Sequence, residues 1–268
     1  MGSVNVAVML MAAALAWMLA ACATLPGGPT VGLAPGAPQV VERLETRRLA
    51  VRSFAMQGEI TGRGGQGELA GEMRILGRFP DRLRAEIAGP FDKPVLLMVS
   101  DGVRLTVLAY GENKAYLGSA SRANLARFLG LALNPAEVYT LLTGSLPVSR
   151  LDQGQAGQGQ VTLSSQPGLA LLRLSHRAGV EEGLIFSLGD YAVQEAWLSQ
   201  GGGGLGLTCR FNSFASLPEG RFPRRVELID SEQRALTINA DKLTINQALD
   251  DKVFEVALPP GLEVQNLD

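Results

Sequence analysis

From Arg52 onward, apolar and polar residues alternate with a period of two. Phe54, Met56 and Ile60 fall on one face of the first alternating segment, opposite Glu59. The alternation recurs at 69–75, 83–87, 103–107, 184–188, 207–211, 226–228 and 236–240. Because Gly, Pro and Asp residues typical of turns separate these short segments, the pattern predicts one antiparallel sheet that is strongly curved or half closed.

Other segments depart from this alternation. Residues 95–99 are apolar throughout, which predicts a strand that is covered on both faces. Apolar residues at helical spacing predict helices over 39–49, 121–130 and 134–143. Asn134 begins an N-capping box at the start of the third helix.

The helices 121–130 and 134–143 carry apolar stripes, and the concave face of the sheet is their natural partner. The candidate ligand-binding residues in the space between them are Leu96, Met98, Leu105, Val107, Leu125, Phe128, Leu129, Leu141, Leu142 and Phe186, and Val103 and Trp197 are expected to line the same space. Two interpretations stay open. The space is either an ordinary filled core or an elongated apolar pocket of several hundred Å³ that accepts acyl chains beneath a movable helical lid.

An uncharged apolar run extends from Val4 to Ala20 at the N-terminus. It is shorter than the roughly 20 apolar residues of a membrane-spanning helix and is typical of a signal peptide. The run ends in Leu19-Ala20-Ala21-Cys22, which resembles the lipobox of bacterial lipoproteins. That match implies a lipoprotein signal peptide over 1–21, cleavage before Cys22 and lipidation of Cys22, with palmitate among the attached chains. The alternative is an ordinary signal peptide or a membrane anchor.

Residues 22–38 join the lipidated Cys to a Pro- and Gly-rich stretch without charge, which is typical of a flexible tether. The folded domain is therefore expected over 39–268. Ala23, and not Asp, follows Cys22, which favours sorting to the outer membrane. We expect the chain to be lipid-anchored on the periplasmic face of that membrane.

Charge and composition argue against several classes of function. The formal net charge of -2 and the pI of about 5.6 leave no basic footprint for nucleic acid. Residues 62–67 satisfy the dinucleotide pattern G-x-G-x-x-G, but the alternation on both sides predicts a hairpin instead. His176 is the single histidine, and Cys209, expected to be buried, is the single cysteine besides Cys22. We therefore expect no metal, no cofactor, no catalytic residue and no enzymatic activity.

The order of elements from Arg82 to Pro147 resembles the LolB family of outer-membrane lipoproteins, which receive lipoproteins from the periplasmic carrier LolA. The match comprises a strand, the loop Ala88-Gly-Pro-Phe-Asp92, an apolar strand, a hairpin, a helix pair and Thr143-Gly-Ser-Leu-Pro147. The resemblance implies an unclosed, or half, β-barrel of about eleven antiparallel strands with a short helical lid over the concave face. It also implies that Phe91 contacts the membrane, in the place of a protruding Leu.

These features favour a membrane-anchored periplasmic lipoprotein that binds the acyl chains of a lipid or a lipidated protein. The resemblance adds a role in lipoprotein localisation to the outer membrane and a periplasmic carrier protein as a partner. The alternative is a non-catalytic envelope scaffold, or accessory lipoprotein, that binds a protein partner and keeps a filled core.

Overall fold

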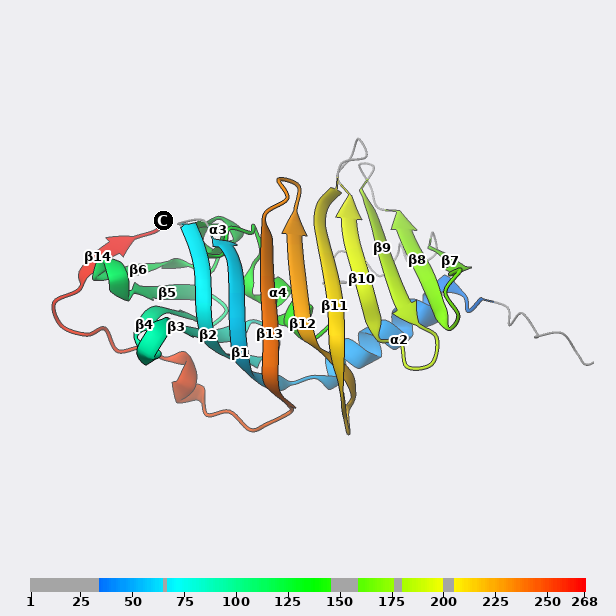
Figure 1. Cartoon of the computed structure of the whole chain (residues 1–268), viewed down its shortest axis with the longest axis horizontal. Coiled ribbons are helices and arrows are strands. Elements are labelled where there is room, and N and C mark those ends of the chain that lie inside the picture. Colours follow the sequence, from blue (N-terminus) through cyan, green and yellow to red (C-terminus); the bar gives the residue numbers. More distant parts are fainter. Residues whose placement is uncertain (1–33, 65–66, 146–158, 176–179, 200–204) are drawn as a thin grey trace, which may run out of the picture. The chain divides into compact units, whose positions relative to one another are not determined.

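The alternating segments form strands of one sheet, and the segments with helical spacing form helices. The computed structural model describes residues 34–64, 67–145, 159–175, 180–199 and 205–268 (Figure 1). The described strands are β1 (Ser53–Gly64), β2 (Gly67–Arg78), β3 (Arg82–Ala88), β4 (Pro94–Ser100), β5 (Arg104–Ala109), β6 (Lys114–Ser119), β7 (Gln160–Leu163), β8 (Leu169–Ser175), β9 (Glu181–Ser187), β10 (Val193–Ser199), β11 (Leu205–Leu217), β12 (Gly220–Asp230), β13 (Ala235–Ile245) and β14 (Glu263–Asn266). The described helices are α2 (Ala37–Ala50), α3 (Arg122–Leu129) and α4 (Pro135–Leu142), with 3-10 turns η1 (Pro90–Asp92), η2 (Tyr110–Glu112) and η6 (Asp251–Phe254). The expected signal peptide, Cys22 and His176 lie outside the described residues.

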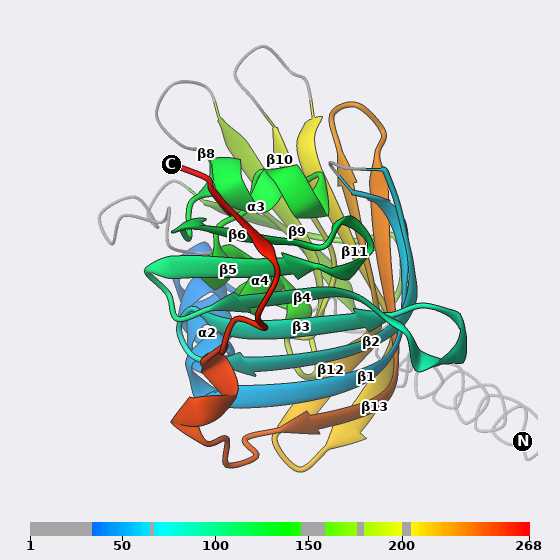
Figure 2. The same cartoon turned by 90° about the vertical axis from the view of Figure 1, so that its left-hand side faces the viewer.

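The strands form one sheet in the order β14-β6-β5-β4-β3-β2-β1-β13-β12-β11-β10-β9-β8-β7. Neighbouring strands are antiparallel, except that β14 runs parallel to β6. The pairing of β1 with β13, which sets Ile60 opposite Ile238, joins the two halves of the sheet. Among the described strands, β14 and β7 end the sheet and do not pair with each other. The predicted unclosed β-barrel is confirmed, and Figure 2 shows how the sheet curves around α3 and α4.

The described sheet has 14 strands, more than the number expected from the sequence. The difference has a simple physical reason. Strands β7 and β14 have four residues each, which is too short for a period of two to stand out. Strand β6 carries the sequence KAYLGS, whose buried residues are adjacent and do not alternate.

The glycine-rich segment that follows β1 belongs to a hairpin. Strands β1 and β2 are antiparallel neighbours, and Gly64 lies opposite Gly67 in their register. A dinucleotide site of this type needs a parallel strand followed by a helix, and neither flank of the motif provides one. The predicted hairpin is therefore confirmed.

The helices cover the concave face of the sheet. Helix α3 lies against β1, whereas α4 lies against β3 and β12. Asn134 and Glu137 form the predicted capping box at the start of α4. Helix α2 begins at Ala37, within the last residues of the segment expected as a tether, and buries Val40 and Leu44 in the same core.

The C-terminal segment, residues 247–268, crosses the convex face of β3 to β6 and is called the C-terminal strap here (Figure 2). Phe254 is buried there against Leu97 and Val99, whereas Leu96 and Met98 of the same strand face the concave core. Strand β4 is therefore covered on both faces, as the sequence predicts.

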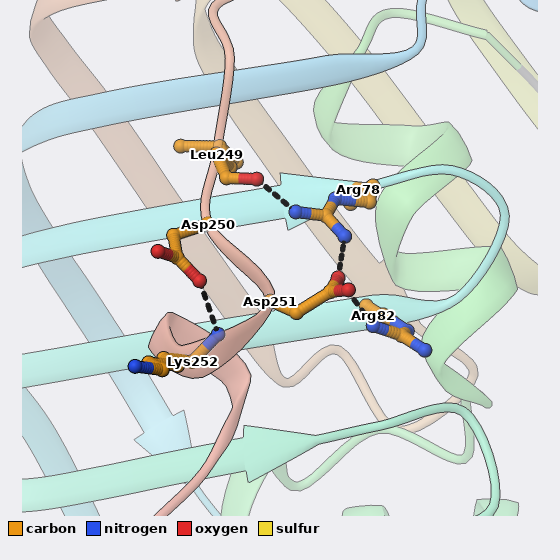
Figure 3. A network of polar contacts seen from close by, with 6 residues as sticks. All are labelled: Arg78, Arg82, Leu249, Asp250, Asp251 and Lys252. Atoms are coloured by element: carbon orange, nitrogen blue, oxygen red, sulfur yellow. Dashed lines mark hydrogen bonds and ion pairs between the residues drawn. The ribbon is translucent and has the colours of Figure 1, made fainter.

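Polar contacts hold the strap on the sheet, as Figure 3 shows. The guanidinium of Arg78 donates to the Asp251 carboxylate and to the Leu249 carbonyl, and Arg82 donates to the same carboxylate at 2.9 Å. Asp250 accepts a hydrogen bond from the backbone N–H of Lys252 at 2.9 Å, which caps η6. These contacts fix the strap over β2 and β3.

Candidate functional site: an apolar cavity beneath the lid

A cavity lies between the concave face of the sheet and the helices α3 and α4, and it is called the inner cavity here. Its lining is wholly apolar and consists of Ile60, Ile75, Leu83, Ala85, Ile87, Leu96, Met98, Leu125, Leu129, Leu131, Leu133, Val138, Leu142, Leu228, Leu236 and Ile238. These side chains come from six strands, both helices and the connection between the helices. A desolvated polar group placed there would lack a hydrogen-bond partner and would cost about 1–3 kcal/mol. The chemistry of the lining therefore favours hydrocarbon.

The volume of the inner cavity is ≈ 50 Å³, so the expectation of several hundred Å³ is wrong for this structure. An engineered cavity of about 150 Å³ in another protein accepts benzene, and the inner cavity is smaller than that. The helices fill the half-barrel better than the sequence indicated, because α2 and the buried leucines of the α3–α4 connection, Leu131 and Leu133, also pack into it.

Five of the ten candidate residues come together around the inner cavity: Leu96, Met98, Leu125, Leu129 and Leu142. The other five, Leu105, Val107, Phe128, Leu141 and Phe186, are buried in the same core but do not line the cavity. Aromatic packing explains two of them. Phe128 lies edge-on to Tyr116 with 5.2 Å between ring centroids, and Phe186 stacks on Tyr191 at 5.7 Å.

Two further residues expected in this space lie elsewhere. Val103 is 75% exposed because it belongs to the turn before β5, where its backbone N–H donates to Asp101. Trp197 follows the buried Ala196 and lies on the opposite, convex face, where its ring covers Gly183. Placing either residue on the concave face was wrong.

Other residues of the cavity lining were not predicted from the sequence. Leu131 and Leu133 of the connection between α3 and α4 are 4% and 6% exposed. The available signal was that these two leucines flank Ala132, an apolar spacing of two residues that places both side chains on the same side of the connection. Ile60, Leu228, Leu236 and Ile238 were predicted on apolar strand faces, but the sequence did not show that α3 and α4 would cover those strands.

An ion pair fastens α3 to α4 and is called the clasp here. The guanidinium of Arg122 donates to both carboxylate oxygens of Glu137, with 2.9 Å between Nε and Oε2. The same carboxylate accepts a hydrogen bond from the backbone N–H of Asn134 at 2.9 Å. The Glu137 side chain is 9% exposed. A bidentate pair with one largely buried partner holds the two helices in a defined geometry.

Tyr139 anchors the other face of α4. Its hydroxyl donates to the carbonyl of Val51 at 3.1 Å, and its ring lies 5.3 Å from Phe54 and 6.0 Å from Phe79, measured between centroids. Burial raises the pKa of the Tyr139 hydroxyl. The phenol is therefore neutral at physiological pH and serves as a donor to the backbone.

The loop between β3 and β4 projects Phe91 from the surface. Phe91 is 94% exposed, as the sequence predicts. Phe91 and Asp92 have left-handed backbone angles, with φ of 63° and 55°. Such a conformation costs a non-glycine residue about 1–3 kcal/mol, and it tends to persist at functional positions. The loop thus holds a large apolar side chain in solvent.

Neither a cluster of metal ligands nor an exposed cysteine occurs among the described residues. No group of three or more His, Cys, Asp and Glu residues within the described ranges could hold a metal ion. Cys209 is 1% exposed, and burial raises the pKa of its thiol, which keeps it protonated and unreactive.

No described helix is both long enough and apolar enough to cross a membrane.

Comparison with known proteins gives similarity in structure. No protein-family model matches the chain, and no curated protein matches its sequence. A LolA superfamily protein from Nitrosomonas europaea is 16% identical, with a TM-score of 0.51 over 83% of this chain and 99% of that one. A domain from Vibrio parahaemolyticus named for outer membrane lipoprotein sorting is 12% identical, with a TM-score of 0.53 over 81% and 97%. A DUF1329 family protein from Desulfovibrio piger is 11% identical, with a TM-score of 0.54 over 82% and 97%.

These identities are low, but the matched structures are covered almost completely. The similarity extends over 81–83% of this chain with TM-scores of 0.51–0.54, in agreement with the resemblance found in the sequence. The chain therefore has the LolA/LolB-like fold.

Proposed function

We propose that this chain is an envelope lipoprotein whose half-barrel binds the acyl chains of a lipid or a lipidated protein without catalysis. The observation that carries the proposal is the inner cavity, which has no polar atom in its lining and lies beneath two short helices. A filled core could have the same composition. The inner cavity is, however, covered by two short helices that the clasp joins to each other. The pair α3 and α4 can therefore move away from the sheet and open the cavity.

The described structure represents the closed state in this proposal. A volume of ≈ 50 Å³ cannot hold an acyl chain, so binding requires α3 and α4 to move away from the sheet. Each methylene that then leaves water contributes about 0.8 kcal/mol. A chain of ordinary length can offset the cost of opening, because its gain grows with every methylene buried.

The proposal includes the membrane anchor that the N-terminal sequence implies. Lipidation of Cys22 and the tether that follows would hold the folded domain at the periplasmic face of the outer membrane. In this setting the chain takes part in lipoprotein localisation, with a periplasmic carrier protein as its partner. The similarity to a domain named for outer membrane lipoprotein sorting supports this part of the proposal through the shared fold alone.

Phe91 is the proposed contact with the membrane surface. Its 94% exposure and the left-handed backbone that holds it outward support this role. An aromatic side chain gains free energy when it moves from water to the interface of a bilayer. The contact would orient the domain once the N-terminal lipid has brought it to the membrane.

Titration of residues 34–268 with an environment-sensitive fluorescent fatty acid tests the binding proposal. We expect saturable binding that the substitution Leu129→Glu abolishes, because a charge placed beside the inner cavity opposes entry of hydrocarbon. Leu49→Glu is the matched control, since Leu49 is 37% exposed on α2. Organic extraction of the purified protein should also release bound lipid. Absence of both saturable binding and extractable lipid would reject the proposal.

The second candidate function is an envelope scaffold that binds a protein partner and keeps its core filled. The small volume of the inner cavity favours it. A scaffold would bind no fatty acid, and Leu129→Glu would then change only its stability.

A further inference from the structure

A second hollow opens beside the lid, and it is called the vestibule here. Its volume is ≈ 330 Å³, and it lies between the α3–α4 connection and the strands β9 to β12. Leu131 and Leu133 line both the vestibule and the inner cavity. A wall of two leucine side chains therefore separates a space open to solvent from the apolar interior.

The clasp stands at the rim of the vestibule. Arg122 and Glu137 both line it, together with the exposed Ala132 between the two leucines. The ion pair joins the first residue of α3 to the first turn of α4, and Glu137 also accepts a hydrogen bond from the backbone N–H of Asn134, where the connection that carries Leu131 and Leu133 ends. If the Arg122–Glu137 ion pair broke, the connection between α3 and α4 could change its conformation, and Leu131 and Leu133 would move with it.

The charges around the vestibule restrict what it can accept. Its described lining holds two arginines and three carboxylates: Arg122, Arg234, Glu137, Glu182 and Asp230. Arg122 is paired with Glu137. Arg234 donates to Asp230, with 2.6 Å between Nε and Oδ2. Both arginines are paired with largely buried carboxylates, so a ligand carboxylate or phosphate would find no uncompensated arginine in the described lining.

Apolar and hydrogen-bonding groups complete the vestibule. Leu198 and Leu207 supply apolar surface, and Ser199 and Ser231 supply hydroxyls. This combination suits the part of a lipid where an acyl chain meets an uncharged ester or amide. It does not suit a charged headgroup.

We propose that the vestibule is the entrance to the inner cavity, and that it recognises acyl chains attached through an uncharged ester or amide. This inference rests on the proposed acyl-chain binding and names its route and its ligand class. The acyl chain passes between Leu131 and Leu133 when the clasp loosens, and the ester or amide stays in the vestibule.

Photo-crosslinking of the full chain in phosphatidylcholine vesicles tests the proposal. The probes are a diazirine-bearing fatty acid methyl ester and the corresponding free fatty acid, and the labelled residues are mapped by mass spectrometry. We expect the ester to label both the vestibule, at Leu198 or Leu207, and the inner cavity, at Met98 or Leu142. We expect the free acid to label the inner cavity about an order of magnitude less.

The substitution Ala132→Trp fills the vestibule and should reduce labelling of the inner cavity by about an order of magnitude. Ala123→Trp is the matched control, because Ala123 is exposed on α3 and lines neither hollow. Labelling of the cavity at the wild-type rate in Ala132→Trp would overturn the route, and equal labelling by ester and acid would overturn the ligand class. Absence of cavity labelling with every probe in the wild-type chain would instead reject the acyl-chain binding on which the route depends.

Discussion

Phe91 combines full exposure with a left-handed backbone, and both features can be tested by substitution. Glycine adopts this conformation without the penalty of a side chain, so Phe91→Gly should raise the free energy of unfolding by about 0.5–1 kcal/mol. The same substitution should weaken flotation of residues 34–268 with phosphatidylcholine vesicles. Denaturant titration and the flotation assay measure the two effects.

Phe91→Leu provides the control for this experiment. It keeps an apolar side chain on the same strained backbone, so both stability and vesicle binding should stay near the wild-type values. A large loss of stability in Phe91→Glu would show that the side chain is needed for packing, and the membrane contact would be wrong.

The reaction rate of the buried Cys209 thiol can report whether α3 and α4 move away from the sheet. Its thiol is 1% exposed, and burial raises its pKa, so a bulky maleimide should react slowly with residues 34–268. Arg122→Ala removes the clasp and should accelerate the reaction. Arg127→Ala, at an exposed position of the same helix, should leave the rate unchanged. Equal rates in both variants and the wild type would mean that the clasp does not restrain the core.

At the scale of elements, the C-terminal strap should be sensitive to acid. Hydrogen bonds from Arg78 lower the pKa of Asp251, and hydrogen bonds from Ser119 and Asn124 lower the pKa of Asp268. A carboxyl whose pKa is lower in the folded state stabilises that state above its unfolded pKa of about 3.9. The stabilisation disappears as the pH falls from that value through the folded pKa. The protection of residues 247–268 against hydrogen exchange, expressed relative to the intrinsic exchange rate at each pH, should therefore fall at acidic pH.

The variants Asp251→Asn and Asp268→Asn provide the comparison for this experiment. Their combination should raise exchange of the strap at neutral pH and flatten its pH dependence. A strap whose protection against exchange is equal at neutral and acidic pH in the wild-type chain would contradict the role of these carboxylates.

Much of the fold could be predicted at this scale, because each long strand and each helix carries its own periodicity. The capping box at Asn134 and the double coverage of β4 follow from a few adjacent residues. What covers an element depends on residues far away in the chain. The cavity size and the outward Trp197 therefore could not be predicted from local pattern.

For the whole molecule, the first prediction concerns the anchor. Cys22→Ala removes the sulfur that would carry the diacylglyceryl group, so the variant should incorporate no labelled palmitate and should keep the segment 1–21. Metabolic labelling followed by mass determination measures both effects. The exposed substitution Leu49→Glu is the control and should be labelled like the wild type. Equal palmitate labelling of Cys22→Ala would reject the assignment.

The pairing of β1 with β13 also determines when the chain can fold. Residues 54–62 pair with residues 236–245, so the centre of the sheet cannot form until almost the whole chain has been made. Phe254, which covers the convex face of β4, and β14, which extends the sheet beside β6, are made later still. Sheets that depend on such distant pairings fold slowly. The export that the proposed signal peptide implies would benefit from this delay, because the two halves of the sheet would meet only after the last strands had crossed the membrane.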